Sequence, residues 1–275
     1  MAYSSRSLNW RLSELIRKLG EKESVLVALS GGVDSSLVAA ASKIALEDRA
    51  VAITADSATL PPGELEAARR VAEEIGIRHL VVKVDELRNP NFVRNKFDRC
   101  YYCKKELIAE FKKVANQLRL KTLVDGTNAE DLKANRPGSV ALMEEGVYSP
   151  LADLGITKGE VRELARLLNL STVEKPSMAC LATRIPYGEE ITLGRLSRVA
   201  EAERFIKDVV GVKQLRVRDH GNLARVEVGR DERSLIFNEK ILESIANKLH
   251  SLGYVYVTVD VDGYRSGSMD GALKP

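Results

Sequence analysis

Short apolar runs alternate with segments of helical periodicity along the first part of the chain. The run from Val25 to Leu29 is apolar throughout, which is typical of a strand buried on both faces. Similar runs cover residues 50–54, 79–84 and 121–125. Apolar residues at helical spacing cover residues 10–20, 37–46, 61–75, 104–118 and 157–168. This alternation predicts an α/β fold, with a parallel sheet and helices on both of its faces.

The pattern changes after residue 192. From there we predict a helix over residues 192–209, followed by two alternating strands, 214–218 and 223–228, joined as a hairpin. A second helix that ends at residue 252 and a last strand over residues 254–259 follow. Such an order is typical of a small α+β domain. We therefore divide the chain into an α/β domain, residues 1–185, and a C-terminal α+β domain, residues 186–275.

The seven residues after the first strand carry the clearest chemical signal. They are Ser30, Gly31, Gly32, Val33, Asp34, Ser35 and Ser36. The two glycines allow a sharp turn close to a ligand, and the serine hydroxyls lie beside the unpaired amides of a helix start. Such a site binds phosphate. Asp34 would repel phosphate, so its presence indicates a Mg²⁺ that bridges its carboxylate to the phosphate oxygens.

This loop matches neither of the two common phosphate-binding patterns, G-x-x-x-x-G-K-[ST] and G-x-G-x-x-G. It resembles the SGGxDS loop of the N-type ATP pyrophosphatases, the superfamily of GMP synthetase, NAD synthetase and the tRNA-thiolating enzymes. The resemblance implies a Rossmann-like adenine nucleotide alpha hydrolase (PP-loop) fold for residues 1–185. It also implies that ATP is cleaved between its α and β phosphates, with pyrophosphate held in the loop. The alternative is a serine-rich helix cap.

Two further segments lie where nucleotide contacts are expected. Asp56 follows the second strand, at the carboxyl edge of the predicted sheet, where ligands bind in this fold class. Asp125, Gly126, Thr127 and Asn128 follow the fourth strand and resemble the second nucleotide motif of the same superfamily. We predict that Asp56, Gly126 and Thr127 contact ATP. For the second segment, a turn with a helix cap is the alternative.

Composition limits the class of protein. The formal net charge is only +3, from 42 cationic and 39 anionic residues, and does not by itself indicate a nucleic-acid partner. No signal peptide and no apolar run of membrane-spanning length is found, so we expect a cytoplasmic protein without a membrane partner. Three cysteines, an odd number, argue against a disulfide framework and for chemistry or metal binding.

Cys100 and Cys103 form a C-x-x-C pair immediately before a predicted helix. This pair fits half a zinc site, a dithiol redox pair, or two ligands of an iron–sulfur cluster. Zinc is disfavoured because it needs four ligands, and only Cys180 and three scattered histidines remain. Cys180 lies in a loop with two prolines, and the neighbouring Lys175 and Arg184 favour a thiolate there. A buried, inert cysteine is the alternative.

The segment around Cys180 restricts the resemblance from the ATP pyrophosphatase superfamily to one family within it. Together with the loop 30–35, the run K-P-x-M-A-C-L-A-x-R-x-P-Y-G resembles the LarE-type sulfur transferases, which build the nickel-pincer nucleotide cofactor of lactate racemase. The likeness covers nearly the full chain, including residues 175–188, 215–221, 224–228 and 263–269. It implies that pyridinium-3,5-biscarboxylic acid mononucleotide is the substrate. ATP would adenylate each carboxylate, and a sulfur nucleophile would displace AMP to leave a thiocarboxylate.

The family has two branches, which differ in the source of sulfur. In the branch with one cysteine, the residue that corresponds to Cys180 gives up its own sulfur. The set Cys100, Cys103 and Cys180 resembles the other branch, in which three cysteines hold a [4Fe–4S] cluster with one open iron that can take sulfide or another sulfur donor. We favour the cluster. We assign catalytic roles to Cys180, Asp34 and Arg184, and the family resemblance implies a homo-oligomer, with a hexamer as the expected size.

Arg216 and Arg218 lie two residues apart on a predicted strand, so both side chains point to one face. Guanidinium groups suit a phosphate, and the family resemblance assigns this pair to the phosphate of the substrate. Glu203, in the preceding helix, is a further candidate for this site. The alternative is a solvated strand face.

Other functions fit the same loop. A tRNA-thiolating enzyme is disfavoured by the modest charge and by the lack of an RNA-binding module. An amide-forming ligase of the NAD or GMP synthetase kind predicts that the cysteines are dispensable. A nucleotide-binding sensor predicts that no pyrophosphate is released with the correct acceptor.

Overall fold

The computed structural model describes residues 5–133, 137–265 and 267–269. Their contacts divide the chain into two compact units, which are described separately: Met1–Ser57, Gly63–Asp85 and Cys100–Ser177 in the first, and Ala58–Pro62, Glu86–Arg99 and Met178–Pro275 in the second. From the sequence we placed a single boundary after residue 185. The contacts divide the chain between Ser177 and Met178, and they assign two earlier segments to the second unit.

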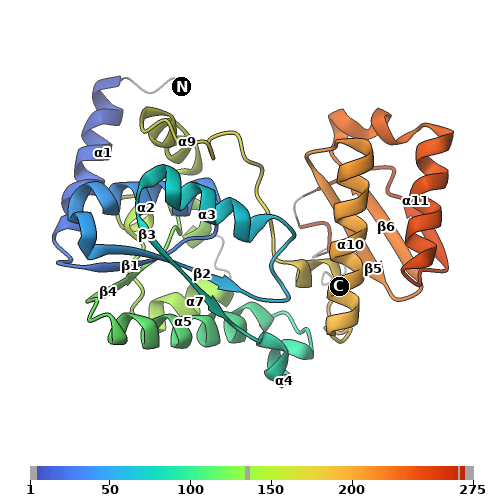
Figure 1. Cartoon of the computed structure of the whole chain (residues 1–275), viewed down its shortest axis with the longest axis horizontal. Helices are drawn as coiled ribbons and strands as arrows, with labels where there is room; N and C mark the ends of the chain where they lie inside the picture. Colours follow the sequence, from blue (N-terminus) through green and yellow to red (C-terminus); the bar gives the residue numbers. More distant parts are fainter. Residues whose placement is uncertain (1–4, 134–136, 266, 270–275) are drawn as a thin grey trace. The chain divides into compact units, whose positions relative to one another are not determined.

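A parallel four-stranded sheet forms the centre of the first unit (Figure 1). Its strand order is β3-β2-β1-β4, and the strands are β1 (Val25–Ala28), β2 (Ala50–Asp56), β3 (Arg78–Lys83) and β4 (Thr122–Val124). In register, Val25 of β1 pairs with Ala50 of β2 and with Thr122 of β4. All three pairings are parallel, which confirms the fold class predicted from the apolar runs.

Helices cover both faces of this sheet, as Figure 1 shows. One face carries α1 (Ser5–Gly20), α2 (Val33–Leu46), α3 (Glu64–Ile75) and α9 (Lys158–Leu167), and the other carries α5 (Arg99–Gln117) and α7 (Pro137–Glu144). Successive residues of β1 serve the two cores, because Val25 and Val27 pack with the first set of helices and Leu26 packs with the second. Shorter helical pieces are η1 (Glu47–Arg49), α6 (Ala129–Lys133) and α8 (Pro150–Asp153).

Two helices begin earlier than the sequence predicted. The first, α2, starts at Val33 because the amide of Ser36 donates to the carbonyl of Gly32, at 3.0 Å, and closes a helical turn inside the loop. The second, α5, starts at Arg99, so Cys100 and Cys103 lie within its first five residues and not before the helix. Residues 99–103 contain no glycine or proline, so nothing local prevents this earlier start.

The second unit has its own three-stranded sheet, ordered β5-β6-β7. Its strands are β5 (Leu215–His220), β6 (Leu223–Val228) and β7 (Tyr256–Val259), and its long helices are α10 (Leu193–Val210) and α11 (Glu239–Ser251). The hairpin of β5 and β6 is antiparallel, as predicted. Leu215 and Val217 face the apolar core shared with the helices, so the residues between and beyond them point to the opposite face. This unit confirms the predicted small α+β domain.

The two early segments of the second unit contribute short helical turns: η2 (Glu86–Arg88) and α4 (Pro90–Val93), with η3 (Leu181–Arg184) and η4 (Arg230–Ile236) later in the chain. The amide of Leu181, directly after Cys180, donates to the carbonyl of Thr59 at 2.9 Å. The segment 58–62 therefore supports the loop of Cys180, which the sequence did not predict. Among the described residues, no helix is long and apolar enough to cross a membrane.

Candidate active site

The loop after β1 is tightly bonded to itself. The amide of Ser30 donates to the hydroxyl of Ser35 at 3.1 Å, and the hydroxyl of Ser36 donates to the carbonyl of Gly32 at 2.8 Å. Gly31 has a φ of +73°, and a Cβ there would lie 3.0 Å from the backbone nitrogen of Ala68 in α3. A side chain at position 31 would thus be strained twice, by its backbone conformation and by α3. The serines and the glycine together give this loop one shape.

Asp34 lies in the first turn of α2 and receives two side chains from distant parts of the first unit. The amide of Asn128 donates to its carboxylate at 3.1 Å, and the ammonium of Lys158 forms an ion pair with it. The predicted Mg²⁺ fits this donor set, because a partly exposed carboxylate at the phosphate loop is the kind of ligand that Mg²⁺ prefers. Lys158 offers a positive charge at the same place.

Sequence reasoning missed Lys158, although one signal was present. It is the first residue of α9, directly after Thr157, whose hydroxyl caps the helix in a capping box with Glu160. A lysine is electrostatically unfavourable at a helix N-terminus, which carries a partial positive charge. A cation at such a position indicates an anionic partner, and that partner here is Asp34.

The loop after β4 rests directly on the start of α2. Asp125 is buried and accepts hydrogen bonds from the hydroxyls of Thr127 and Ser149, both at 2.5 Å. A Cβ on Gly126 would lie 2.7 Å from the backbone nitrogen of Ser35. The side chain of Asn128 caps α6 by accepting from the amide of Glu130 at 2.9 Å. This segment is therefore both a helix cap and a neighbour of the phosphate loop.

Replacing Gly126 by alanine is expected to destabilise the first unit by about 1–3 kcal/mol, because the new methyl group collides with backbone that has no room to move. The same collision should displace the start of α2 and weaken ATP binding. Denaturant unfolding and an ATP titration measure the two effects. Gly20→Ala is the control, since a Cβ there meets nothing within 4 Å. Equal stability of the two variants would contradict the close approach.

Two more predicted positions lie in the first unit. Asp56 is the last residue of β2 and lies at the carboxyl edge of the sheet, as the sequence predicted, with its carbonyl bonded to the amide of Val84 at 3.0 Å. Lys175 was predicted to favour a thiolate at Cys180. Its ammonium instead donates to the carbonyl of Gly31 and to Glu64, both at 3.0 Å, so it braces the phosphate loop.

In the second unit, Cys180 is the residue before η3, and it is a partly exposed residue. The carbonyls of Ala179 and Cys180 accept hydrogen bonds from Arg184, at 2.8 and 3.1 Å. The guanidinium of Arg184 is fully buried and binds both carboxylate oxygens of Glu203, at 2.8 and 3.1 Å. Because this guanidinium is enclosed and directed to backbone and Glu203, it shapes the loop that presents Cys180 and does not face the solvent.

Glu203 links this loop to the second sheet. One of its carboxylate oxygens accepts from the amide of Val217 in β5, at 3.0 Å, and from Arg184. Glu203 thus joins the Cys180 loop to β5 through a buried ion pair that the sequence could not specify, and its place in the substrate site stays a prediction.

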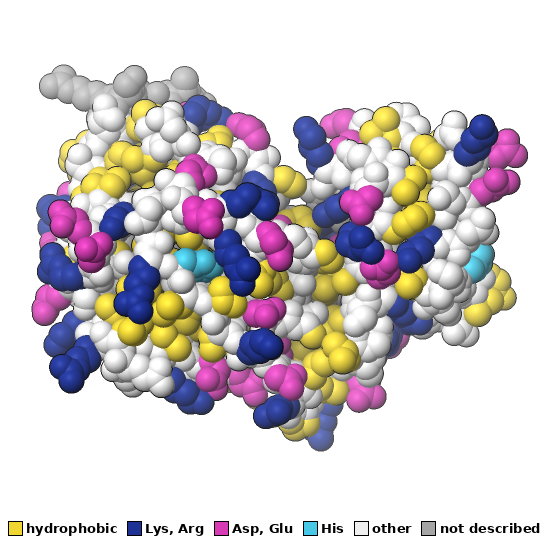
Figure 2. Space-filling model, viewed as in Figure 1, with side chains coloured by type: hydrophobic (Ala, Val, Ile, Leu, Met, Phe, Trp, Pro, Cys, Tyr) yellow, Lys and Arg dark blue, Asp and Glu magenta, His cyan; other side chains and the backbone are white. Residues whose placement is uncertain are grey.

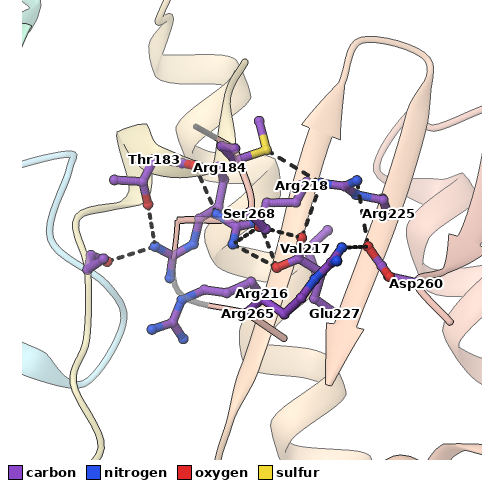
Figure 3. Close-up of polar contacts among 12 residues, drawn as sticks. Thr183, Arg184, Arg216, Val217, Arg218, Arg225, Glu227, Asp260, Arg265 and Ser268 are labelled. Atoms are coloured by element: carbon purple, nitrogen blue, oxygen red, sulfur yellow. Dashed lines mark hydrogen bonds and ion pairs between the residues drawn. The ribbon is translucent and has the colours of Figure 1, made fainter. Parts of the chain in front are cut away.

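Arg216 and Arg218 lie on the same face of β5, as their spacing predicts, and both are buried (Figure 3). Arg218 forms an ion pair with Glu227 at 2.7 Å and donates to the carbonyl of Thr183 at 3.0 Å. Arg216 donates to the carbonyl of Leu215 at 2.6 Å and lies 5.1 Å from the ring centroid of Tyr264. The alternative of a solvated strand face is wrong.

The two arginines differ in charge balance. Glu227 neutralises Arg218, whereas burial lowers the pKa of the Arg216 guanidinium, and the nearby cation of Arg184 lowers it further against the opposing effect of Glu203. A buried cation in such surroundings gains from an added anion.

Comparison with known proteins identifies the family. A family model described as NAD synthase matches residues 5–122, which include the loop 30–36 and three strands of the parallel sheet. Pyridinium-3,5-bisthiocarboxylic acid mononucleotide synthase of Lactiplantibacillus plantarum is 32% identical over 273 residues, which cover 97% of this chain and 96% of that protein. The chain belongs to this LarE family of PP-loop enzymes.

Other relatives agree with this assignment. An uncharacterized protein of Synechocystis is 42% identical over 266 residues, which cover 97% of this chain and 99% of that protein. One chain of the glutamine-hydrolyzing GMP synthase of Halobacterium salinarum is 30% identical over 215 residues, 71% of this chain and 68% of its own length. The predicted PP-loop fold, the LarE resemblance and the use of ATP by the enzyme are thereby confirmed.

The three cysteines of this LarE family member are thiols outside any disulfide, with Cys100 exposed and the other two partly exposed. Cys100 and Cys103 are three residues apart in one helical turn, a spacing that brings two side chains to the same side of a helix. Within the described ranges, no group of three or more His, Cys, Asp or Glu side chains is placed to hold a metal ion. The [4Fe–4S] ligand set therefore stays a prediction.

Proposed function

We propose that this chain is an ATP-dependent sulfur transferase that converts the two carboxylates of pyridinium-3,5-biscarboxylic acid mononucleotide to thiocarboxylates. The observation that carries the proposal is the similarity to the synthase of this compound's bisthiocarboxylic acid form, which extends over 97% of the chain and so includes both units. A role in sulfur transfer is also consistent with Cys180 of the second unit, which is partly exposed.

In the first step, a substrate carboxylate oxygen attacks the α phosphorus of ATP, and pyrophosphate leaves. We assign the loop Ser30 to Ser36 to the pyrophosphate, with Asp56, Gly126 and Thr127 on the nucleotide. Bound to Asp34, Mg²⁺ would neutralise the charge of the phosphates. Lys158, which is already paired with Asp34, supplies a second positive charge at the place where negative charge accumulates.

In the second step, a sulfur nucleophile attacks the carbonyl carbon of the adenylated carboxyl group, and AMP leaves with the bonding electron pair. A carboxylate is a poor acyl donor until its oxygen is part of such a leaving group. Cys180 is the residue that we place at the sulfur. We assign Arg216 and Arg218 to the substrate phosphate and Arg184 to positioning, because its hydrogen bonds hold the backbone at Cys180.

The source of the sulfur has two candidates. Cys180 can give up its own sulfur, or Cys100, Cys103 and Cys180 can hold a [4Fe–4S] cluster, whose open iron would supply a binding position for external sulfide. We favour the cluster because the chain has two thiols in one helical turn besides Cys180. A homo-oligomer is also part of the proposal.

The decisive experiment is anaerobic purification followed by iron and sulfide analysis and by intact mass before and after turnover with ATP, Mg²⁺ and the substrate. About four irons per chain, lost when any of the three cysteines becomes alanine, together with an unchanged protein mass, would support the cluster. A protein without iron, whose mass falls by the elements of H₂S, would instead mean that Cys180 is consumed. Absence of pyrophosphate release with this substrate would refute the proposed function.

Transfer RNA is the competing substrate in this superfamily. On the face seen in Figure 2, cationic and anionic side chains are interspersed over both units. Such a surface does not favour an extended nucleic-acid contact. Tight binding of bulk tRNA with a steep salt dependence would overturn our preference.

A further inference from the structure

A threonine on an inner strand of the parallel sheet bonds to the backbone that enters the phosphate loop. Thr54 belongs to β2, which lies between β1 and β3 (Figure 1). Thr54 is buried, and its hydroxyl donates to the carbonyl of Leu29 at 2.6 Å. The amide of Leu29 donates in turn to the carbonyl of Ile53 at 2.8 Å. Both polar groups of the backbone at Leu29 are therefore held by β2, directly before Ser30 begins the loop.

The carbonyl of Leu29 and the amide of Ser30 belong to the same peptide group. That amide donates to the hydroxyl of Ser35 at 3.1 Å. Because a peptide group is planar, the hydroxyls of Thr54 and Ser35 together fix the orientation of the whole group. The hydroxyl of Ser30 itself lies 3.0 Å from that of Ser35 and accepts from the amide of Gly32 at 3.3 Å. The orientation of this peptide group is therefore transmitted to the phosphate loop.

His79 adds a second hydrogen bond from the neighbouring strand, β3. Its Nε2 lies 2.8 Å from the hydroxyl oxygen of Thr54. A carbonyl can only accept, so the hydroxyl hydrogen of Thr54 points to Leu29, and its oxygen accepts from the Nε2–H of His79. Thr54 pairs in register with Val81, two residues after His79, so the two side chains lie on the same face of the sheet. A chain of hydrogen bonds thus runs from β3 to the entrance of the phosphate loop.

We propose that Thr54 and His79 are positioning residues for the phosphate loop. Thr54 fixes the peptide group that enters the loop, and His79 holds the hydroxyl of Thr54 in the orientation that this requires. The role rests on the proposed function only in that the loop is assigned there to the pyrophosphate part of ATP. Neither side chain is proposed to contact ATP. Without the hydroxyl, the buried carbonyl of Leu29 loses this donor, so the peptide group can turn away from its orientation.

The test is the affinity of the chain for a nucleotide that it cannot cleave. In α,β-methylene-ATP a carbon replaces the oxygen between the α and β phosphorus atoms, and its binding with Mg²⁺ is measured by isothermal titration calorimetry. Thr54→Val keeps the shape of the side chain and removes the hydroxyl, so we expect the dissociation constant to rise about tenfold. Thr54→Ser keeps the hydroxyl and should bind nearly as tightly as the unaltered chain.

His79→Phe keeps a ring at this position and removes the Nε2–H donor. We expect it to weaken binding about threefold, because the hydroxyl of Thr54 remains but loses the donor that orients it. Since His79 acts only through Thr54, the double variant should bind no more weakly than Thr54→Val alone. Two independent effects on the fold would add instead.

Thr172→Val is the matched control, because it makes the same exchange at another buried threonine of the first unit. The hydroxyl of Thr172 is buried and has no hydrogen-bond partner among the described residues. Its removal leaves no other group unpaired, so we expect an unchanged affinity and no loss of stability. Denaturant unfolding of every variant shows whether it is folded at the temperature of the titration.

An unchanged affinity in folded Thr54→Val would overturn the proposal, as would an equal loss in Thr172→Val or additive losses in the double variant. If Thr54→Val does not fold, an unchanged affinity in His79→Phe would overturn it. These titrations contain no substrate, so they are separate from the turnover experiment. A chain that binds the analogue as expected but transfers no sulfur would leave the positioning role intact and refute the proposed function.

Discussion

Replacing Cys180 by serine is expected to reduce thiocarboxylate formation by about a thousandfold or more, because a serine hydroxyl is a far weaker nucleophile and iron ligand than a thiolate at neutral pH. The loss follows whether Cys180 gives its own sulfur or binds a cluster. Adenylation should persist, since we assign it to the phosphate loop and not to Cys180. The loop of Cys180 should also survive, because Arg184 holds the carbonyls of Ala179 and Cys180 and not the thiol.

The measurement separates the two steps. Pyrophosphate release with ATP and the substrate reports adenylation, and mass spectrometry of the product reports the thiocarboxylate. Ser251→Ala, which removes an exposed hydroxyl at the end of α11, is the control and should leave both unchanged. A serine variant that retains full product would show that Cys180 is not at the sulfur. If that variant also formed amide from ammonia, the ligase alternative would be favoured.

Asp34→Asn is expected to slow pyrophosphate release by about a thousandfold, because the amide removes the negative charge that would hold Mg²⁺ against the phosphates. The change keeps the size of the side chain at a partly exposed position, so the fold should be retained. The change also deprives Lys158 of its carboxylate partner. Because the proposed Mg²⁺ ligand is lost, the remaining rate should depend less on the Mg²⁺ concentration.

Titration of pyrophosphate release against Mg²⁺ concentration checks this result. Asp48→Asn removes an exposed carboxylate that pairs with Lys43 at 3.1 Å, and this control should behave like the unaltered enzyme. Wild-type Mg²⁺ dependence in Asp34→Asn would place the metal elsewhere. The two variants, Cys180→Ser and Asp34→Asn, should thus divide the reaction into its sulfur step and its nucleotide step.

Much of the fold could be predicted because the signals are local. The run Val25 to Leu29 must be buried on both faces wherever it lies, and the glycines and serines that follow it can form few structures other than a phosphate loop. The same holds for the hairpin of β5 and β6, whose alternation places Arg216 and Arg218 on one face. The start of α5 at Arg99 was missed, although Asp98, a residue type favoured at helix N-caps, directly precedes it.

The partners of the site residues were beyond such reasoning, because each contact is made by segments far apart in the chain. Lys158 reaches Asp34 across 124 positions, and Lys175 reaches Gly31 across 144. Arg184 was predicted to have a catalytic role and to favour a thiolate at Cys180, yet a buried carboxylate from α10 binds its guanidinium. Nothing in the residues next to Arg184 specifies Glu203.

By itself, the sequence determined the strand and helix pattern, the phosphate loop and the family, since these depend on residue type and short-range spacing. Only the tertiary structure decided which charges are neutralised and which side chains hold the loops, such as Glu227 for Arg218 and Asn95 for the loop after Cys180. The physical reason is that a buried ion or amide must find its partner in space, and long-range packing alone brings that partner within hydrogen-bond distance.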